Sequence, residues 1–294
     1  MANLKELRNR ISSVTSTQKI TRAMQMVAAS KLRKAQDAVE STRPYSDKLS
    51  QVVGNLSKEM DGDDNAPKLL VGNGKSKRYL FVIATSERGL CGGFNSSITR
   101  LASQKALELI GSGKEVQFIC VGKKGKASLS REFGDRIIEF FDFSEVRNLS
   151  FEQGDAISQK IISLFEKDKF DICHLYFSKF ESVLTQIPTE RVIIPSNFEE
   201  DNNETKPSQE AYYEYEPDEV EILRDLLPKN LSIQIFSALL ENFASEQGAR
   251  MTAMDNATRN ADEMIDKLKI TYNRSRQATI TSELIEIISG AEAL

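Results

Sequence analysis

The chain has 294 residues and a formal net charge of −4; 28% of its residues are charged, 7% are aromatic and none is tryptophan. This length can bury the core of one large or two ordinary domains, and the low content of glycine (15) and proline (7) favours long helices over an all-β fold. The three cysteines lie too far apart for a zinc site or a disulfide framework, which indicates a reducing compartment.

Residues 1–59 are predicted to form one long helix, and we expect no signal or transit peptide because the helical pattern begins at once. Apolar residues recur at steps of three and four, the spacing of a coiled-coil seam that drifts around the helix. The predicted seam residues are Leu4, Leu7, Ile11, Val14, Ile20, Met24, Val27, Ala28, Leu32, Ala35 and Val39. Residues 1–34 carry eight Lys or Arg against one acid, so this helix is strongly basic.

Residues 60–76 are rich in Gly, Asp and Asn and are expected to be a linker. An open α/β domain is expected at 77–200, because apolar runs suited to buried strands alternate with amphipathic helical patterns. The expected strands are 78–86, 115–122, 136–141 and 171–180, with edge strands at 185–195 and 212–217, and the expected helices are 94–110 and 150–168. Asn95 or Ser96 is the predicted N-cap of the first helix.

Residues 201–217 are expected to form an acidic loop and edge segment, since 199–225 has a net charge of −9. A second long helix is predicted at 218–294, with Pro228 expected to kink it. Its predicted seam is mostly small or polar: Ala257, Ala261, Met264, Leu268, Thr271, Ser275, Ala278, Ser282 and Ile285. Because both terminal helices leave one domain, the predicted fold is a long antiparallel coiled coil with an inserted small, Rossmann-like α/β domain.

The segment SERGLCGGFN (residues 86–95) brackets Cys91 with glycines, as in a nucleophile elbow. A thiol hydrolase would also need an aspartate and His174, the one histidine of the chain. The candidate aspartates are Asp135, Asp142, Asp155 and Asp171. His174 lies within an apolar run, which favours a packing role, and we expect the glycines at 89, 92 and 93 to let this loop pass close to the coiled coil.

Two other functions can be weighed on the residues. The segments GNGKS (72–76) and GSGKE (111–115) end like P-loops but have Leu69 and Glu108 where the first glycine is required, so we interpret them as turns. The basic helix could attract nucleic acid or an anionic membrane, but its charges are scattered without interleaved aromatics. An acidic protein partner is therefore favoured. The sequence contains no run of about 20 apolar residues, so no membrane span is predicted. A structural coiled-coil protein with an α/β domain is the main alternative.

Four motifs in this order resemble the gamma subunits of bacterial F-type ATP synthases over essentially the whole chain. They are STQKITRAMQMVAASKLRKAQ (16–36), SERGLCGGFN (86–95), LLENFASEQGARMTAMDNATRNADEMI (239–265) and YNRSRQATITSELIEIISGAEAL (272–294). The resemblance implies a central rotor shaft that couples proton flow to ATP synthesis or hydrolysis inside a ring of alpha and beta subunits. It also implies an α/β domain resting on the epsilon subunit and the c-subunit ring, at the cytoplasmic face of the inner membrane.

The resemblance further implies roles for single residues, none of them catalytic, cofactor-binding or metal-binding. Arg276 and Gln277 would hydrogen-bond a loop of beta, and Met24 and Arg250 lie in motifs associated with coupling. The basic residues that would face acidic segments of beta are Lys19, Arg22, Lys31, Arg33 and Lys34. The apolar tip that would sit in a hydrophobic sleeve of the alpha/beta ring consists of Leu284, Ile285, Ile287 and Ile288. Gly248 stands where alanine is common in the family, at a helix cost of about 1 kcal/mol.

Overall fold

A computed structural model describes residues 4–59, 66–146, 148–196 and 219–292. The chain divides into two compact units, a larger one of Lys31–Ala249 and a smaller one of Met1–Ser30 with Arg250–Leu294. Helix α1 (Leu4–Glu59) and helix α6 (Glu219–Glu292) each contribute to both units. Both long helices were predicted, and each contains its one proline, Pro44 or Pro228, without ending there.

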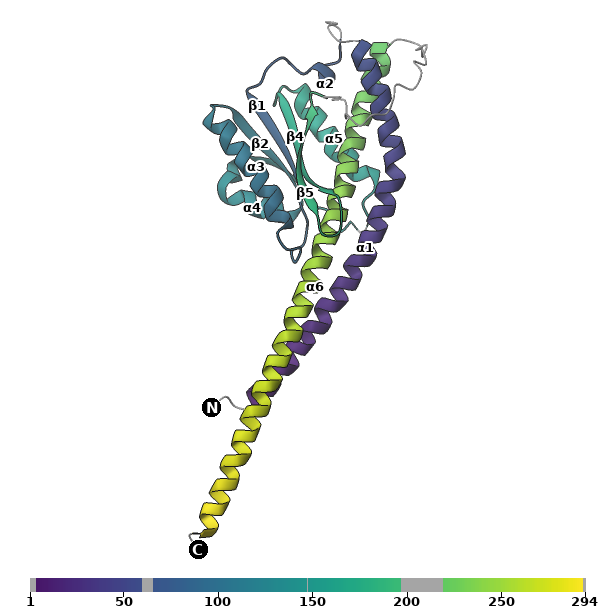
Figure 1. The fold of residues 1–294 in the computed structure, drawn as a ribbon. Helices are drawn as coiled ribbons and strands as arrows, with labels where there is room; N and C mark the ends of the chain where they lie inside the picture. The colour runs from purple at the N-terminus through teal and green to yellow at the C-terminus, as the bar shows by residue number, and fades with distance from the viewer. Residues whose placement is uncertain (1–3, 60–65, 147, 197–218, 293–294) are drawn as a thin grey trace. The chain divides into compact units, whose positions relative to one another are not determined.

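The larger unit is built on a five-stranded sheet in the order β3-β2-β1-β4-β5 (Figure 1). Its strands are β1 (Arg78–Ala84), β2 (Glu115–Val121), β3 (Ile137–Phe141), β4 (Ile172–Phe180) and β5 (Gln186–Ile194). The pairs β1–β2, β2–β3 and β1–β4 are parallel, whereas β5 runs antiparallel to β4 along one edge. The edge position of β5, expected from Pro188, is confirmed. The expected strand at 212–217 and the acidic loop at 201–217 lie outside the described residues.

Helices cover both faces of this sheet. Helices α3 (Phe94–Gly111) and α4 (Lys123–Phe133) lie on one face, and α5 (Phe151–Glu166) with the first part of α6 lies on the other (Figure 1). The first face packs Ile98 and Leu129 against Phe81 and Phe118. On the second face, apolar residues of α5 and α6 share one core with β1 and β4: Leu80, Val82, Ile157, Ile161, Leu231, Ile235, Ala238 and Leu239. Helix α6 is therefore a layer of the α/β domain as well as a terminal helix.

Two helices were not predicted. Helix α4 was missed because five of the eleven residues in its sequence, KKGKASLSREF, are charged and only Gly125, Leu129 and Phe133 lie on its buried side. The short helix α2 (Lys68–Val71) interrupts the segment expected to be a linker. Its Leu69 and Leu70 pack against a cluster formed by α1 and α6, so this segment contributes to the core.

Helices α1 and α6 pack together within the larger unit at two places. Val53 and Leu56 of α1 are fully buried with Leu223 and Leu227 of α6. Farther along α6, Ala244 is buried with two earlier residues of α1, Leu32 and Ala35. The residue numbers of the contacts increase along α6 as they decrease along α1. The two helices are therefore antiparallel, as predicted.

Candidate functional site

The smaller unit is an antiparallel helix pair whose contact surface combines apolar and polar residues; its buried side chains are Leu7, Ala28, Met254, Thr258, Ala261 and Ile265. Four cross-helix hydrogen bonds join successive positions: Gln25 to Asp255 (3.0 Å), Thr21 to Thr258 (2.7 Å), Gln18 to Asp262, and Arg8 to Tyr272 (2.9 Å). Hydrogen bonds of this kind specify the register of a coiled coil, because a shifted partner would leave them unmade.

The observed contact between the two helices differs in part from the predicted seam. Ile20 and Val27 were expected in the contact with α6, but their side chains are 60% and 56% exposed. The seam predicted on α6 is likewise shifted by one residue: Met264 is 48% exposed and Ile265 is buried, and Thr271 and Ala278 are exposed whereas Tyr272 and Thr279 are half-buried. On α1 the prediction failed at these positions because it chose apolar residues, whereas Gln18, Thr21 and Gln25 make the cross-helix hydrogen bonds here.

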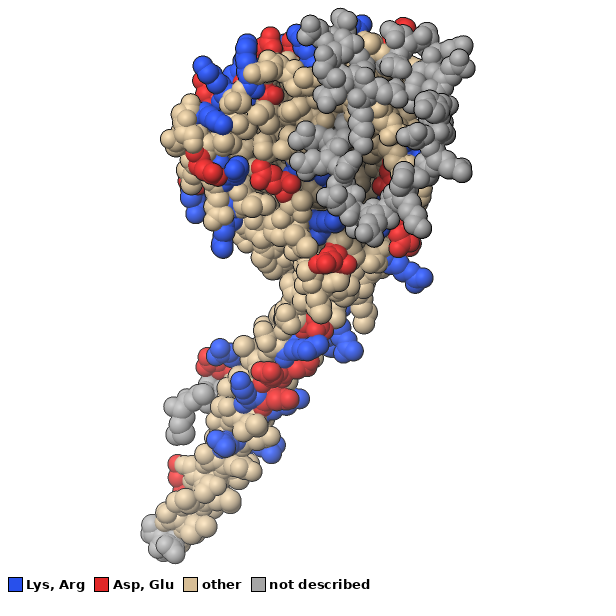
Figure 2. Space-filling view, turned by 45° about the horizontal axis from the view of Figure 1, so that its top comes forward, with Lys and Arg blue, Asp and Glu red and all other residues tan. Residues whose placement is uncertain are grey.

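The five basic residues expected to face beta are all exposed. Lys19 and Arg22 belong to the smaller unit, and Lys31, Arg33 and Lys34 belong to the larger one. Within the described part of the chain, no ion pair neutralises any of these five side chains. Figure 2 shows basic and acidic side chains interspersed along the helices of the smaller unit.

The two residues expected in the coupling motifs, Met24 and Arg250, are both half-buried in the smaller unit. Arg276 and Gln277, expected to contact beta, are exposed on α6. Arg276 and Gln277 are thus surface residues that another chain can reach.

The last part of α6 extends past its helical partner. Arg8, only four residues after the start of α1, bonds Tyr272, so the described part of α1 has almost no residues left to pair with α6 beyond that point. The apolar tip is exposed, with accessible fractions of 53% for Leu284, 58% for Ile285 and Ile288, and 67% for Ile287. In Figure 2 the end of this helix carries few charges. An exposed apolar helix end of this kind is a surface that a protein partner can cover.

The loop around Cys91 does not form the site of a thiol hydrolase. Cys91 is 2% exposed, and its Sγ accepts a hydrogen bond from Asn95 Nδ2 at 3.2 Å. His174 is engaged elsewhere, with Nδ1 2.6 Å from Glu190 Oε1 and its ring against Phe81. Burial lowers the pKa of His174, although the Glu190 carboxylate opposes this. The acidic partner of His174 is thus Glu190 and none of the four candidate aspartates.

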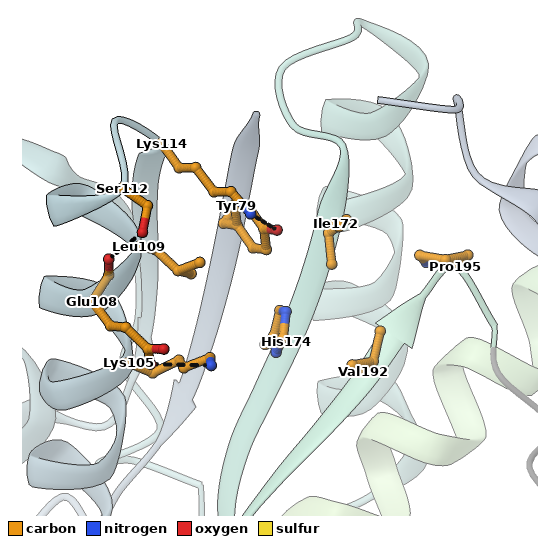
Figure 3. A pocket seen from close by; sticks show the side chains of 10 residues that line it. All are labelled: Tyr79, Lys105, Glu108, Leu109, Ser112, Lys114, Ile172, His174, Val192 and Pro195. Atoms are coloured by element: carbon orange, nitrogen blue, oxygen red, sulfur yellow. Dashed lines mark hydrogen bonds and ion pairs between the residues drawn. The ribbon is translucent and has the colours of Figure 1, made fainter. Parts of the chain in front are cut away.

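A cavity of about 500 Å³ adjoins His174 (Figure 3). It lies between the end of α3 and the starts of β1 and β4, and Cys91 does not line it. Its polar groups largely satisfy one another: Lys105 pairs with Glu108 at 3.2 Å, and Lys114 Nζ donates to Tyr79 Oη at 2.9 Å. The cavity therefore presents no free constellation for catalysis.

One expectation about loops needs correction: neither Asn95 nor Ser96 is the N-cap of α3. Asn95 does not cap α3; the cap position is Gly93, and Asn95 Oδ1 instead accepts the backbone N–H of Ser86 at 2.9 Å. A Cβ atom at Gly89 would meet Lys124 and one at Gly93 would meet Ser96, and the expected approach of this loop to the coiled coil stays a prediction. In the loop at 72–76, Asn73 Nδ2 donates to Asp171 at 2.8 Å, which agrees with the interpretation of this segment as a turn.

The glycine that allows a close approach to α6 is Gly154 of α5. A Cβ atom there would lie 2.7 Å from Cβ of Phe236. The sequence signal was a lone glycine inside an otherwise good helical pattern.

No described helix is long and apolar enough to cross a membrane.

Comparison with known proteins gives a consistent result. A family model described as ATP synthase matches residues 3–294. The chain is 56% identical over 294 residues to the ATP synthase gamma chain of Parvibaculum lavamentivorans and 56% identical over 294 residues to that of Brucella canis, with 100% of each chain covered.

Solved structures share the fold. A central stalk and c-ring structure of the Tetrahymena thermophila mitochondrial ATP synthase matches with a TM-score of 0.59 and 25% identity, covering 81% of this chain and 99% of the other. A chain of the Euglena gracilis mitochondrial ATP synthase matches with a TM-score of 0.67 and 19% identity, covering 99% of this chain and 94% of the other.

Proposed function

This chain belongs to the family of ATP synthase gamma chains, and from that premise we propose that it is the central-stalk rotor subunit of its complex. It couples proton flow through the membrane sector to ATP synthesis or hydrolysis in the ring of alpha and beta subunits. The observation that carries this proposal is identity of 56% over the full length to a gamma chain. The paired terminal helices with their exposed basic residues support it.

The role of the chain in this mechanism is mechanical, and the nucleotide sites belong to the alpha and beta subunits. A given rotor angle biases each beta subunit only through contacts that differ between its open and closed states. The features that favour a non-catalytic role are the buried Cys91 and the engagement of His174 with Glu190.

The exposed residues of the helices are the proposed contacts with the ring. The basic side chains that face acidic segments of beta are Lys19, Arg22, Lys31, Arg33 and Lys34. Arg276 and Gln277 bond a loop of beta, and Met24 and Arg250 support coupling. The tip formed by Leu284, Ile285, Ile287 and Ile288 sits in an apolar sleeve of the ring, where burial of its exposed surface favours seating.

The remaining partners are the epsilon subunit and the c-subunit ring, which the α/β domain contacts. The complex is peripheral at the cytoplasmic face of the bacterial inner membrane, and this chain has no direct membrane span or nucleic-acid ligand in that role. The proposed divisions are 1–59 and 218–294 for the coiled-coil helices, 60–76 for the linker, 77–200 for the α/β domain and 201–217 for the acidic segment.

Affinity purification of the tagged chain from its own cells tests this proposal. We expect alpha and beta subunits to co-purify in a complex that hydrolyses ATP. Recovery of the intact chain without alpha and beta would contradict the proposal and would leave a structural coiled-coil protein as the better interpretation.

A further inference from the structure

Ser178 of β4 lies where the sheet can no longer satisfy its backbone. The pairing of β4 with β1 ends at Tyr176, two residues earlier. On the other side, Ser178 is opposite Pro188 of β5, but the N–H and C=O of a strand residue point to the same edge, and those of Ser178 point toward α6 and away from Pro188. A buried backbone group without a partner is costly, so Ser178 needs hydrogen bonds from outside the sheet.

Helix α6 supplies both of these hydrogen bonds. Asn242 Oδ1 accepts the Ser178 N–H at 3.0 Å, and Ser245 Oγ donates to the Ser178 carbonyl at 2.9 Å. Asn242 is 4% exposed and Ser245 is fully buried. Residues three apart lie on one face of a helix, which is why both side chains reach the same residue of β4. We call these three residues the clasp.

Apolar contacts surround the clasp on α6. Leu239 packs in the core of the sheet, and Ala244 packs with Leu32 and Ala35 of α1. Apolar burial stabilises such contacts but has no direction, so it resists separation better than it resists sliding. The two hydrogen bonds are directional and hold α6 at one position along the strand and one rotation about its own axis.

A weaker second attachment lies nearer the start of α6. Ser232 Oγ donates to Asp155 of α5 at 2.9 Å, but it also donates to Pro228 of its own helix at 3.0 Å. Asp155 is partly exposed, whereas both α6 residues of the clasp are buried. The clasp is therefore the most thoroughly desolvated polar link described between α6 and the rest of the larger unit.

We propose that Asn242 and Ser245 are the positioning residues through which rotation passes between the α/β domain and the α6 shaft. This inference rests on the rotor function proposed above. Torque about the axis of α6 acts parallel to the contact surface between α6 and β4. Apolar contacts offer little resistance to sliding in that direction. The clasp makes the domain and this part of α6 turn together.

The test is the angular spread of a rotor probe in the assembled complex of alpha, beta and this chain. The three cysteines are buried, so a probe can be attached selectively through Arg136→Cys, an exposed position of the α/β domain. The variants are Ser245→Ala and the double change Asn242→Leu with Ser245→Ala. The matched control is Ser130→Ala, whose hydroxyl bonds only Lys126 of its own helix at 2.7 Å.

With the rotor held at a catalytic pause, we expect the double variant to widen the angular variance by about twofold, at an unchanged ATP hydrolysis rate. Ser245→Ala alone gives a smaller increase, and Ser130→Ala gives none. Unchanged variance in the assembled double variant overturns the proposal. If that variant does not assemble, unchanged variance in Ser245→Ala overturns it in the same way. Failure of the unmodified chain to rotate refutes the rotor function itself, and the clasp proposal falls with it.

Discussion

Gly154 faces α6, and a Cβ atom at this position would lie 2.7 Å from Cβ and 3.0 Å from Cα of Phe236. The second of these atoms belongs to the backbone of α6 and cannot move away as a flexible side chain would. Gly154→Ala should therefore force the two helices apart and lower the free energy of unfolding by about 1–3 kcal/mol. Urea denaturation of the purified chain measures this, and an unchanged midpoint would contradict the packing described.

Gly248 is also buried in a helix, yet its substitution should have the opposite sign. A Cβ atom there would lie 3.4 Å from Phe180 and 3.5 Å from Gln186, which are ordinary contact distances. Gly248→Ala should raise the free energy of unfolding by about 0.5–1 kcal/mol, since alanine restricts the unfolded chain and favours the helix. The same denaturation experiment checks it, and a loss of stability would show that the site has less room than these distances indicate.

Asp171 is a buried carboxylate that holds the start of β1. Burial alone would raise its pKa, but hydrogen bonds from Arg78, Asn73 and the backbone N–H of Lys77 outweigh this and lower the pKa. A lowered pKa in the folded state means that Asp171 stabilises the fold above its unfolded value of about 3.9 and loses this effect as the pH falls toward the folded value.

Asp171→Asn should consequently lower the free energy of unfolding at pH 7 by about 1–3 kcal/mol, because the charge-assisted bonds to Arg78 and the backbone are weakened. The difference from the unmodified chain should shrink as the pH is lowered below about 4. Denaturation curves at several pH values measure both effects. An equal difference at pH 7 and pH 3 would show that the carboxylate charge is unimportant.

At the scale of elements, the sequence predicted α1, α3, α5, α6 and the five strands because their apolar patterns are long and regular. Helix α4 was not predictable in this way, since only Leu129 and Phe133 provide apolar anchors among charged residues. The seam of the smaller unit was only partly predictable, because hydrogen bonds between Gln, Thr and Asp side chains replace apolar contacts there.

The candidate site was predictable only in part. The chemistry of its exposed residues follows from the sequence, but their partners lie on other chains and came from the family resemblance. The clasp went unnoticed, although the buried polar residues Asn242 and Ser245, three apart within LLENFASEQ, were a usable signal. The sequence does not show that these two residues contact Ser178 of β4.

The overhanging end of α6 supports a prediction about turnover. Arg276 and Gln277 are exposed, beyond almost all of the α1 pairing, so replacing both with alanine should leave this chain folded. In the assembled complex, Arg276→Ala with Gln277→Ala should lower steady-state ATP turnover by about tenfold, as expected for the loss of hydrogen bonds to a partner loop. Turnover assays of gel-filtered complexes check this, and normal turnover in the double variant would remove these residues from the torque path.

On the scale of the whole molecule, α1 and α6 are the two segments that run through both compact units. Each of these helices is continuous from one unit into the other. In the larger unit α6 is held by the clasp and by apolar packing, and in the smaller unit the two helices are held in register by polar pairs. Directional hydrogen bonds in both units suit a rotor subunit whose helices must turn without sliding against their neighbours.

Rotation of this chain inside a ring of alpha and beta subunits is the motion from which the other proposals follow. Its most direct test is single-molecule observation of a probe on Arg136→Cys in the surface-immobilised complex supplied with ATP. We expect stepwise rotation in one direction, in time with ATP hydrolysis. A complex that contains this chain and hydrolyses ATP while the probe stays still would contradict it.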